Sequence, residues 1–293
     1  MCSPRIMTHV YGTIESRGAP IGRRSLFGAV GAAALAAAVA PANATAAPAP
    51  APGASLVDLT HTLTPNFPVW PGAQQFAMRP VARIGDAPTP LGSLGIGAPS
   101  VFSKNELRYD EHTGTHVDAP AHASVNGLTV EQIPPHDLVV PLAVVDISGR
   151  ARDDSDTLLT RQDILDWESD HGPLPDRCLV AMNSGWDIRA AQPARFTNRD
   201  VAGVQHTPGF DPDAVEFLVR ERDIVALGSD TLSIDAGRST TYGAHLAALG
   251  AGKYAVEALA NLSRMPPSGA TVMVGAPTHA GGSGGPCRTL GWF

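Results

Sequence analysis

The chain has 293 residues, of which 43% are hydrophobic and 17% charged, and a formal net charge of −7 at pH 7. This length suffices for one large domain or two small ones with a sizeable core. The acidic balance argues against a nucleic-acid-binding protein, which needs clustered lysines and arginines. Three cysteines are too few for a disulfide scaffold.

The amino-terminal segment has the charge pattern of an export signal. Residues 1–24 carry +3 and residues 25–57 carry no charge, so the remainder carries −10. Arg23 and Arg24 precede an apolar stretch of 15 residues, 26–40, which is shorter than the roughly 20 residues of a membrane span. Small-residue A-x-A cleavage sites follow it.

These features predict a twin-arginine-type signal peptide over residues 1–46 and export to the periplasm or beyond the cell. Cleavage would leave no stable membrane anchor; an uncleaved anchor or a tail is the alternative. Residues 47–55 are Ala/Pro-rich and predict a linker that cannot build a core. Residues 56–293 contain no repeat or second linker, and predict one domain.

Beyond the linker, segments typical of strands and helices alternate along the chain. Strands are predicted at 56–60, 138–147, 177–183, 224–227 and 270–274. Helices are predicted at 160–169 with Thr160 as cap, at 211–222 with Asp211 as cap and Pro212 first, and at 244–262. Residues 85–100 are rich in Gly and Pro and predict a loop. The alternation indicates an α/β fold, a mixed sheet with packed helices.

The densest group of potential metal ligands lies in the segment DEHTGTHVDAPAH, residues 110–122. Gly114, three β-branched residues and Pro120 oppose a helix here. Side chains alternate in an extended chain, so the even-numbered ligand candidates would share one side until the proline bends the strand: His112, His116, Asp118 and His122. Two imidazoles with a carboxylate suit a borderline divalent ion such as Zn²⁺, Mn²⁺ or Fe²⁺.

The motif H-x-G-T-H-x-D-A-P-x-H in this segment resembles the signature of the metal-dependent cyclase family, which includes bacterial kynurenine formamidase and isatin hydrolase. Further segments are similar to those of the family, in the same order: 56–61, 68–72, 183–186, 228–235 (GSDTLSID) and 282–286. His245 and Glu257, twelve residues apart, match the spacing of the family's late metal ligands. The resemblance covers nearly the whole chain after the linker.

The resemblance implies metal ligands at five positions of this sequence. His112, His116 and Asp118 would be the first ligands. His245 and Glu257 would complete the site or hold a second ion, with Asp118 bridging the two. The implied cofactor is therefore one or two divalent ions, Zn²⁺ or Mn²⁺.

The resemblance also implies that His122 is the general acid/base and that Trp70 faces the ring of a small-molecule substrate. The implied fold is a swivelling β/β/α domain, and the implied assembly is a homodimer. The predicted reaction is hydrolysis of a small aryl formamide or cyclic amide, a non-peptide C–N bond.

Elementary chemistry is consistent with this reaction. A divalent ion can lower the pKa of its bound water from about 15.7 to roughly 7, so that hydroxide attacks a carbonyl that the ion also polarises. The leaving amine needs a proton, which His122 could carry near neutral pH. No serine or cysteine nucleophile is required, and Ser184 lacks the flanking glycines of a nucleophile elbow.

Two other functions fit parts of the pattern. An Fe(II) oxygenase would use His116, Asp118 and His245 as its triad, but the two further ligand candidates would fill positions that such a triad keeps open. A non-catalytic exported metal- or ligand-binding protein would have no need of His122. Export also argues against the kynurenine role itself, because tryptophan breakdown is cytoplasmic.

Several residues outside the motifs have structural rather than catalytic interpretations. His61 is expected at a strand end, His206 in a loop, and His279 in a structural role near the glycine-rich tail. Cys178, in an apolar run, is expected to be a buried small side chain. Its pairing with Cys287 is left open.

Overall fold

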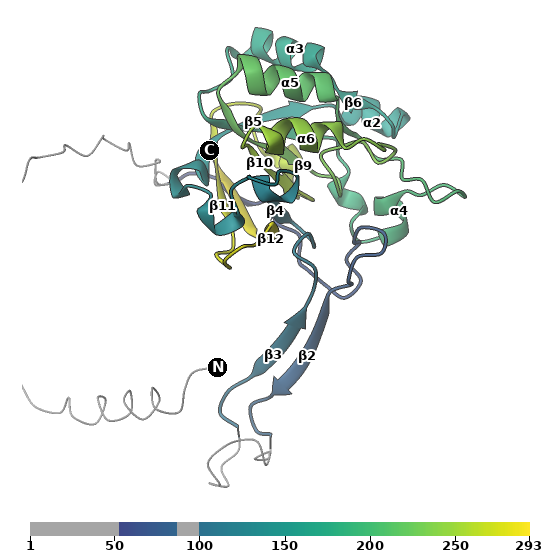
Figure 1. The fold of residues 1–293 in the computed structure, drawn as a ribbon, viewed down its shortest axis with the longest axis vertical. Helices are drawn as coiled ribbons and strands as arrows, with labels where there is room; N and C mark the ends of the chain where they lie inside the picture. The colour runs from purple at the N-terminus through teal and green to yellow at the C-terminus, as the bar shows by residue number, and fades with distance from the viewer. Residues whose placement is uncertain (1–52, 87–99) are drawn as a thin grey trace, which may run out of the picture. The chain divides into compact units, whose positions relative to one another are not determined.

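A nine-stranded mixed sheet organises the computed structural model, which describes residues 53–86 and 100–293 (Figure 1). The strand order is β1-β13-β11-β5-β7-β9-β10-β4-β12. Its strands are β1 (Leu56–Asp58), β4 (His116–Asp118), β5 (Val139–Asp146), β7 (Cys178–Asn183), β9 (Ile224–Ser229), β10 (Tyr254–Glu257), β11 (Ala270–Gly275), β12 (Gly284–Pro286) and β13 (Arg288–Trp292). The predicted α/β class with a mixed sheet is confirmed.

Three sequence predictions fall wholly or partly outside the described residues. The predicted signal peptide, 1–46, lies outside them entirely. Residues 47–52 of the predicted linker and residues 87–99 of the predicted loop lie outside them as well.

The centre of the sheet consists of parallel neighbours, β5-β7-β9-β10. Every residue of β7 and β9 is buried. Both strands are covered on both faces, which is why their sequences are largely apolar. At one end of this core β4 pairs antiparallel with β10, and β12 pairs antiparallel with β4. Two of the predicted metal ligands, His116 and Asp118, therefore lie on a strand of the sheet.

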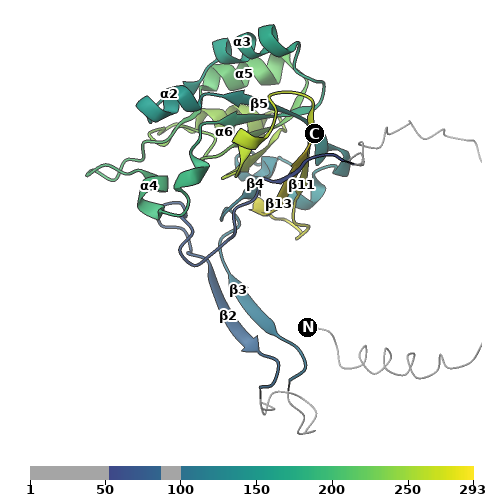
Figure 2. The ribbon, with the colours of Figure 1, turned by 180° about the vertical axis from the view of Figure 1, so that it is seen from behind.

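The helices are α2 (Ser148–Asp153), α3 (Arg161–His171), α4 (Pro193–Thr197), α5 (Pro212–Glu221) and α6 (Gly243–Gly250). Apolar residues of α3, α5 and α6 form one buried cluster with β5, β7 and β9, and both views show α3 and α5 side by side over the sheet (Figures 1 and 2). The caps are as predicted: Thr160 and Asp163 form a capping box, and Asp211 accepts from the N–H of Asp213 at 3.1 Å.

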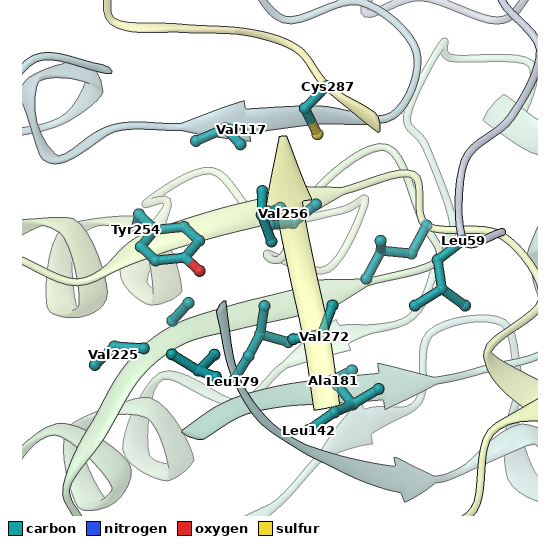
Figure 3. Packing of buried hydrophobic residues seen from close by; sticks show 14 of the residues in the cluster. Leu59, Val117, Leu142, Leu179, Ala181, Val225, Tyr254, Val256, Val272 and Cys287 are labelled. Carbon is teal, nitrogen blue, oxygen red and sulfur yellow. The ribbon is translucent and has the colours of Figure 1, made fainter. Parts of the chain in front are cut away.

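The second buried cluster lies on the other side of the central strands, where the sheet curls over itself. Val272 of β11 packs in one cluster with Leu179 of β7 and Val256 of β10 (Figure 3). Val117 of β4 and Leu59 belong to the same cluster. This packing fixes β4 against the core through Val117, and with it His116 and Asp118 on either side.

The predicted helix over 244–262 is wrong in its second half. The helix ends at Gly250, a turn follows in which Gly252 has φ +76°, and the chain continues as β10 and then as a 3-10 turn at Leu262–Arg264. Burial between β9 and β4 favours the strand over the helix. The correction moves Glu257 from a helix to a strand next to β4.

A two-stranded hairpin, β2 (Ala77–Ala82) and β3 (Lys104–Arg108), was not predicted. Each of its strands pairs with the other alone within the described part of the chain, and nearly all of its residues are exposed. Figures 1 and 2 show it apart from the main sheet. A second small sheet joins β6 (Leu158–Leu159) to β8 (Gly209–Phe210).

The cysteines and the hydropathy of the helices settle two smaller points. Cys178 and Cys287 are both free and buried, so the pairing that the sequence left open does not form. Burial raises the pKa of each thiol to about 12. Within residues 53–86 and 100–293, no helix has both the length and the apolar character that crossing a bilayer requires.

Candidate metal centre and substrate cavity

The centre of the candidate site is the contact between β4 and β10. His116 and Asp118 lie two residues apart on β4, so their side chains point to the same face of the sheet. Glu257, at the end of β10, lies directly opposite His116 in the strand register. His245 reaches the same place from α6. All four side chains are buried.

His116, Asp118 and Glu257 have ligand atoms within 4.8 Å of one another, and His245 faces the other oxygen of each carboxylate. His116 Nε2 lies 3.2 Å from Asp118 Oδ1 and 3.4 Å from Glu257 Oε2. His245 Nε2 lies 3.4 Å from Asp118 Oδ2 and 3.2 Å from Glu257 Oε1. Two atoms bound to the same ion at ~2.0–2.2 Å are separated by about 3.0–3.5 Å. The spacing therefore fits a divalent cation among these atoms.

The orientation of the two imidazoles supports the same conclusion. His116 Nδ1 lies 2.8 Å from the carbonyl of Gly114, and His245 Nδ1 lies 2.6 Å from Asp235 Oδ2. Donation from Nδ1 leaves each Nε2 lone pair directed at carboxylate oxygens, an arrangement that is typical of metal-ligating histidines. Within the described residues, His116 Nε2 and Asp118 Oδ2 are buried without a hydrogen-bond partner. A cation would satisfy both atoms.

The electrostatics of the site favour positive charge. Burial opposes protonation of His116, but the carboxylates of Asp118 and Glu257 outweigh it and raise its pKa to about 10. Burial likewise opposes protonation of His245, and the neighbouring carboxylates raise its pKa to about 12. Although burial acts in the opposite direction, the histidines hold the pKa of Asp118 well below its usual range. Two protons or one divalent cation can supply this charge.

His112 and His122 reach the site through turns rather than through strand alternation. The extended conformation predicted for the motif holds only for β4: Gly114 turns the chain before it with φ +71°, and the 3-10 turn Pro120–His122 follows it. The two rings stack with centroids 3.9 Å apart, and His112 Nδ1 lies 2.5 Å from Asp118 Oδ1. Burial lowers the pKa of His122, so this imidazole is neutral at pH 7 and can accept a proton.

The structure thus brings together all five predicted ligands and the predicted acid/base, although the role of each stays a prediction. Two groups have ligand atoms within 4.8 Å of one another, His112-Asp118-His122 and His116-Asp118-Glu257. Because Asp118 belongs to both groups, the arrangement has room for one ion or for two that share this carboxylate.

A cavity of about 550 Å³ opens onto these residues. Trp70 lines it and packs against a buried cluster that includes Phe67, Trp186 and Phe196, while its contact with a substrate ring stays a prediction. Tyr242 and Leu246 line the more exposed part of the cavity. Sequence reasoning missed these two residues; the signal available was their position three residues before and one residue after His245.

A second missed feature is the set of side chains that hydrogen-bond to the candidate ligands. Asp235 orients His245, and its carboxylate also accepts from two N–H groups at the start of α6. Behind His112, Ser283 Oγ lies 3.0 Å from Nε2 and donates to Glu111, which in turn lies 2.9 Å from His279. His279 therefore approaches the site indirectly. In the sequence, only the order of the similar segments pointed to Asp235 and Ser283.

The remaining candidates lie away from the cavity. His61 packs against Phe67 with ring centroids 5.4 Å apart, and His206 pairs with Asp156 at 2.8 Å. Ser184 donates from Oγ to the buried carboxylate of Asp230 at 2.5 Å, as expected for a structural residue.

This fold and site define the class of protein. Residues 57–236 match the family model described as "Putative cyclase", which is more than half of the chain. The protein therefore belongs to the cyclase family, and the family expected from the motif of residues 112–122 is confirmed.

Individual relatives narrow the comparison. The chain is 33% identical over 246 residues to an isatin hydrolase of Roseibium aggregatum, covering 80% of this chain and 90% of that protein. It is 28% identical over 237 residues to a kynurenine formamidase of Salinibacter ruber, covering 80% and 96%. A crystal structure of an isatin hydrolase bound to the product analogue thioisatinate aligns with a TM-score of 0.74 at 30% identity, covering 82% and 92%.

Asp235→Asn should weaken metal binding by about 10–100-fold, because loss of the carboxylate behind a ligating histidine reduces its basicity and its orientation. Competition against a chromophoric chelator measures the affinity, and circular dichroism checks that α6 remains folded. Asp166→Asn, at an exposed position of α3 away from the site, serves as the control. Equal affinities for both variants and the wild type would show that Asp235 does not orient a ligand.

Proposed function

We propose that the protein is a metal-dependent hydrolase of small aryl formamides or cyclic aryl amides. The observation that carries the proposal is the pair His116 and His245, each directing Nε2 at two buried carboxylates with the spacing of a cation site. This site opens onto a cavity with Trp70 in its wall. Family membership and the amide-hydrolysing relatives support the reaction class.

We place the cation among His116, Asp118 and Glu257, with His245, whose Nε2 lies 3.2 Å from Glu257 Oε1, as a fourth candidate ligand. A bound Zn²⁺ or Mn²⁺ would supply the Lewis acidity that lowers the pKa of water and polarises the substrate carbonyl. His112, beside Asp118, is available to a second ion.

The chain's own residues supply binding and proton transfer. The face of Trp70 binds the substrate ring, which directs the amide toward the buried end of the cavity. His122 lines the cavity as a neutral imidazole, accepts a proton from the attacking water and delivers it to the leaving nitrogen. Stacking on His112 restricts the orientation of the His122 ring.

His122→Asn should retain bound metal and lose about 10²–10⁴-fold in turnover of N-formylaniline, the usual contribution of a positioned acid/base. Metal analysis and a colorimetric aniline assay measure the two properties on the same sample. His206→Asn, a histidine outside the cavity, should match the wild type. His116→Ala should lose both metal and turnover.

Two results would contradict these assignments. A His122→Asn variant with near wild-type turnover would remove the acid/base role. A His122→Asn variant that no longer holds metal would make His122 a ligand of the second group, with His112 and Asp118.

We further propose a homodimer in which the β2–β3 hairpin contacts a second copy. Met78 and Leu107 face each other across the hairpin, and their exposed fractions are 54% and 52%. Arg79 and Glu106, the next pair, form an ion pair on the opposite face. A two-stranded hairpin is marginally stable alone, so its apolar face gains most from a partner surface.

Replacing Met78 by Lys and Leu107 by Glu should convert a dimer to a monomer, because opposite charges preserve the cross-strand pair but remove the apolar face. Multi-angle light scattering measures the mass. The matched control is the reversed pair on the other face, Arg79→Glu with Glu106→Arg, which should remain dimeric. A monomeric wild type, or a dimeric apolar-face variant, would refute this interface.

The charge pattern of residues 1–46 supports a third proposal, export through the twin-arginine route. Arg23→Lys with Arg24→Lys should leave the full-length chain in the cytoplasm, as cell fractionation and intact mass would show. Arg5→Lys with Arg17→Lys preserves the pair and should be exported. Equal export of both variants would contradict the signal.

A further inference from the structure

Helix α6 presents three side chains to the cavity. Tyr242 is its N-cap, and its ring lies opposite Trp70 with centroids 6.4 Å apart and planes inclined by 56°. His245 and Leu246, three and four residues later, also line the cavity. The start of α6 therefore brings an aromatic ring, a candidate metal ligand and an apolar side chain to one cavity.

The backbone at Tyr242 is left-handed, with φ 51° and ψ 42°. This conformation suits glycine or asparagine and is unfavourable for a bulky side chain. The surrounding turn imposes it: Ser239 Oγ accepts from the N–H of Tyr242 at 3.1 Å. A Cβ on Gly243 would come within 2.7 Å of Pro212, so the next residue is also confined. A tyrosine occupies a position where the backbone favours other residues.

Burial in the core does not account for that tyrosine. Its exposed fraction is 46%, and it belongs to none of the buried clusters formed by the described residues. Trp70, opposite, is supported by the buried aromatic cluster behind it. The cavity therefore has one aromatic side chain supported by the core, Trp70, and a second, more exposed one, Tyr242, that packs against it.

We infer that Tyr242 is a specificity-determining residue that, together with Trp70, selects substrates with a planar aryl ring; this inference rests on the proposed function. Aromatic rings favour tilted or offset contacts at centroid separations of about 4.5–7 Å. The Trp70 and Tyr242 rings line the cavity side by side, so a flat ring lying against the exposed face of Trp70 also contacts Tyr242. A puckered ring of the same size is thicker and makes neither aromatic contact.

Position 242 allows the ring to be removed without straining the turn. Tyr242→Gly and Tyr242→Asn suit the left-handed backbone, and Tyr242→Phe keeps the aromatic ring. Ile188→Ala, at a side chain that is 80% exposed and absent from the cavity lining, is the surface control. The substrates are N-formylaniline and N-cyclohexylformamide, which share ring size and differ in planarity.

Loss of an aromatic contact corresponds to about a twofold to twelvefold effect. The Gly and Asn variants should raise KM for N-formylaniline by this factor, with kcat within about twofold and N-cyclohexylformamide hydrolysis unchanged. Tyr242→Phe should retain the aryl preference. Calorimetry with metal-loaded protein should show the same loss of preference for benzoate over cyclohexanecarboxylate.

The two measurements separate the two hypotheses. Suppose that the wild type hydrolyses neither amide, yet prefers the aryl ligand in calorimetry, and that Tyr242→Gly loses this preference. That result would contradict the proposed function and support the role of Tyr242. Unchanged preference in calorimetry for the Gly and Asn variants, or equal losses for aryl and cyclohexyl ligands, would overturn that role.

Discussion

The mutual repulsion of two buried carboxylates, Asp118 and Glu257, is the constraint on which the rest of the site depends. They approach from adjacent strands, and each is buried. Burial and the charge of Asp118 both act to raise the pKa of Glu257, yet His245 and His116 bring it below its ordinary value. Two negative charges in a region of low dielectric need compensating positive charge close by. The imidazoles direct lone pairs there, so a cation is the natural complement.

The fold provides that arrangement with short, rigid connections. The β4–β10 register places Glu257 opposite His116, and a 2.7 Å hydrogen bond from the N–H of Ile234 holds one Glu257 oxygen. Asp235, next in the chain, orients His245 and caps α6. Ile234 and Asp235 thus hold two candidate ligands, Glu257 and His245, from one short segment of the chain.

The sequence predicted the parts of the site that depend on local chemistry. The residues at 112–122 could be recognised as potential metal ligands because three histidines and an aspartate lie close together. Strand alternation correctly placed His116 and Asp118 on one side. The sequence could not show that Glu257 lies on a strand, because a short apolar run after a helix has no periodicity of its own. Tyr242 and Ser283 were missed for a related reason: their significance arises from tertiary contacts with Trp70 and His112.

The account as a whole depends on a cation between Asp118 and Glu257, and metal analysis of the purified mature protein tests this most directly. It should be combined with hydrolysis of N-formylaniline and isatin before chelation, after chelation and after readdition of Zn²⁺ or Mn²⁺. The account predicts at least one ion per chain, loss of hydrolysis with the ion, and recovery on readdition. Full hydrolysis by metal-free protein, or failure to bind either ion at micromolar concentration, would contradict it.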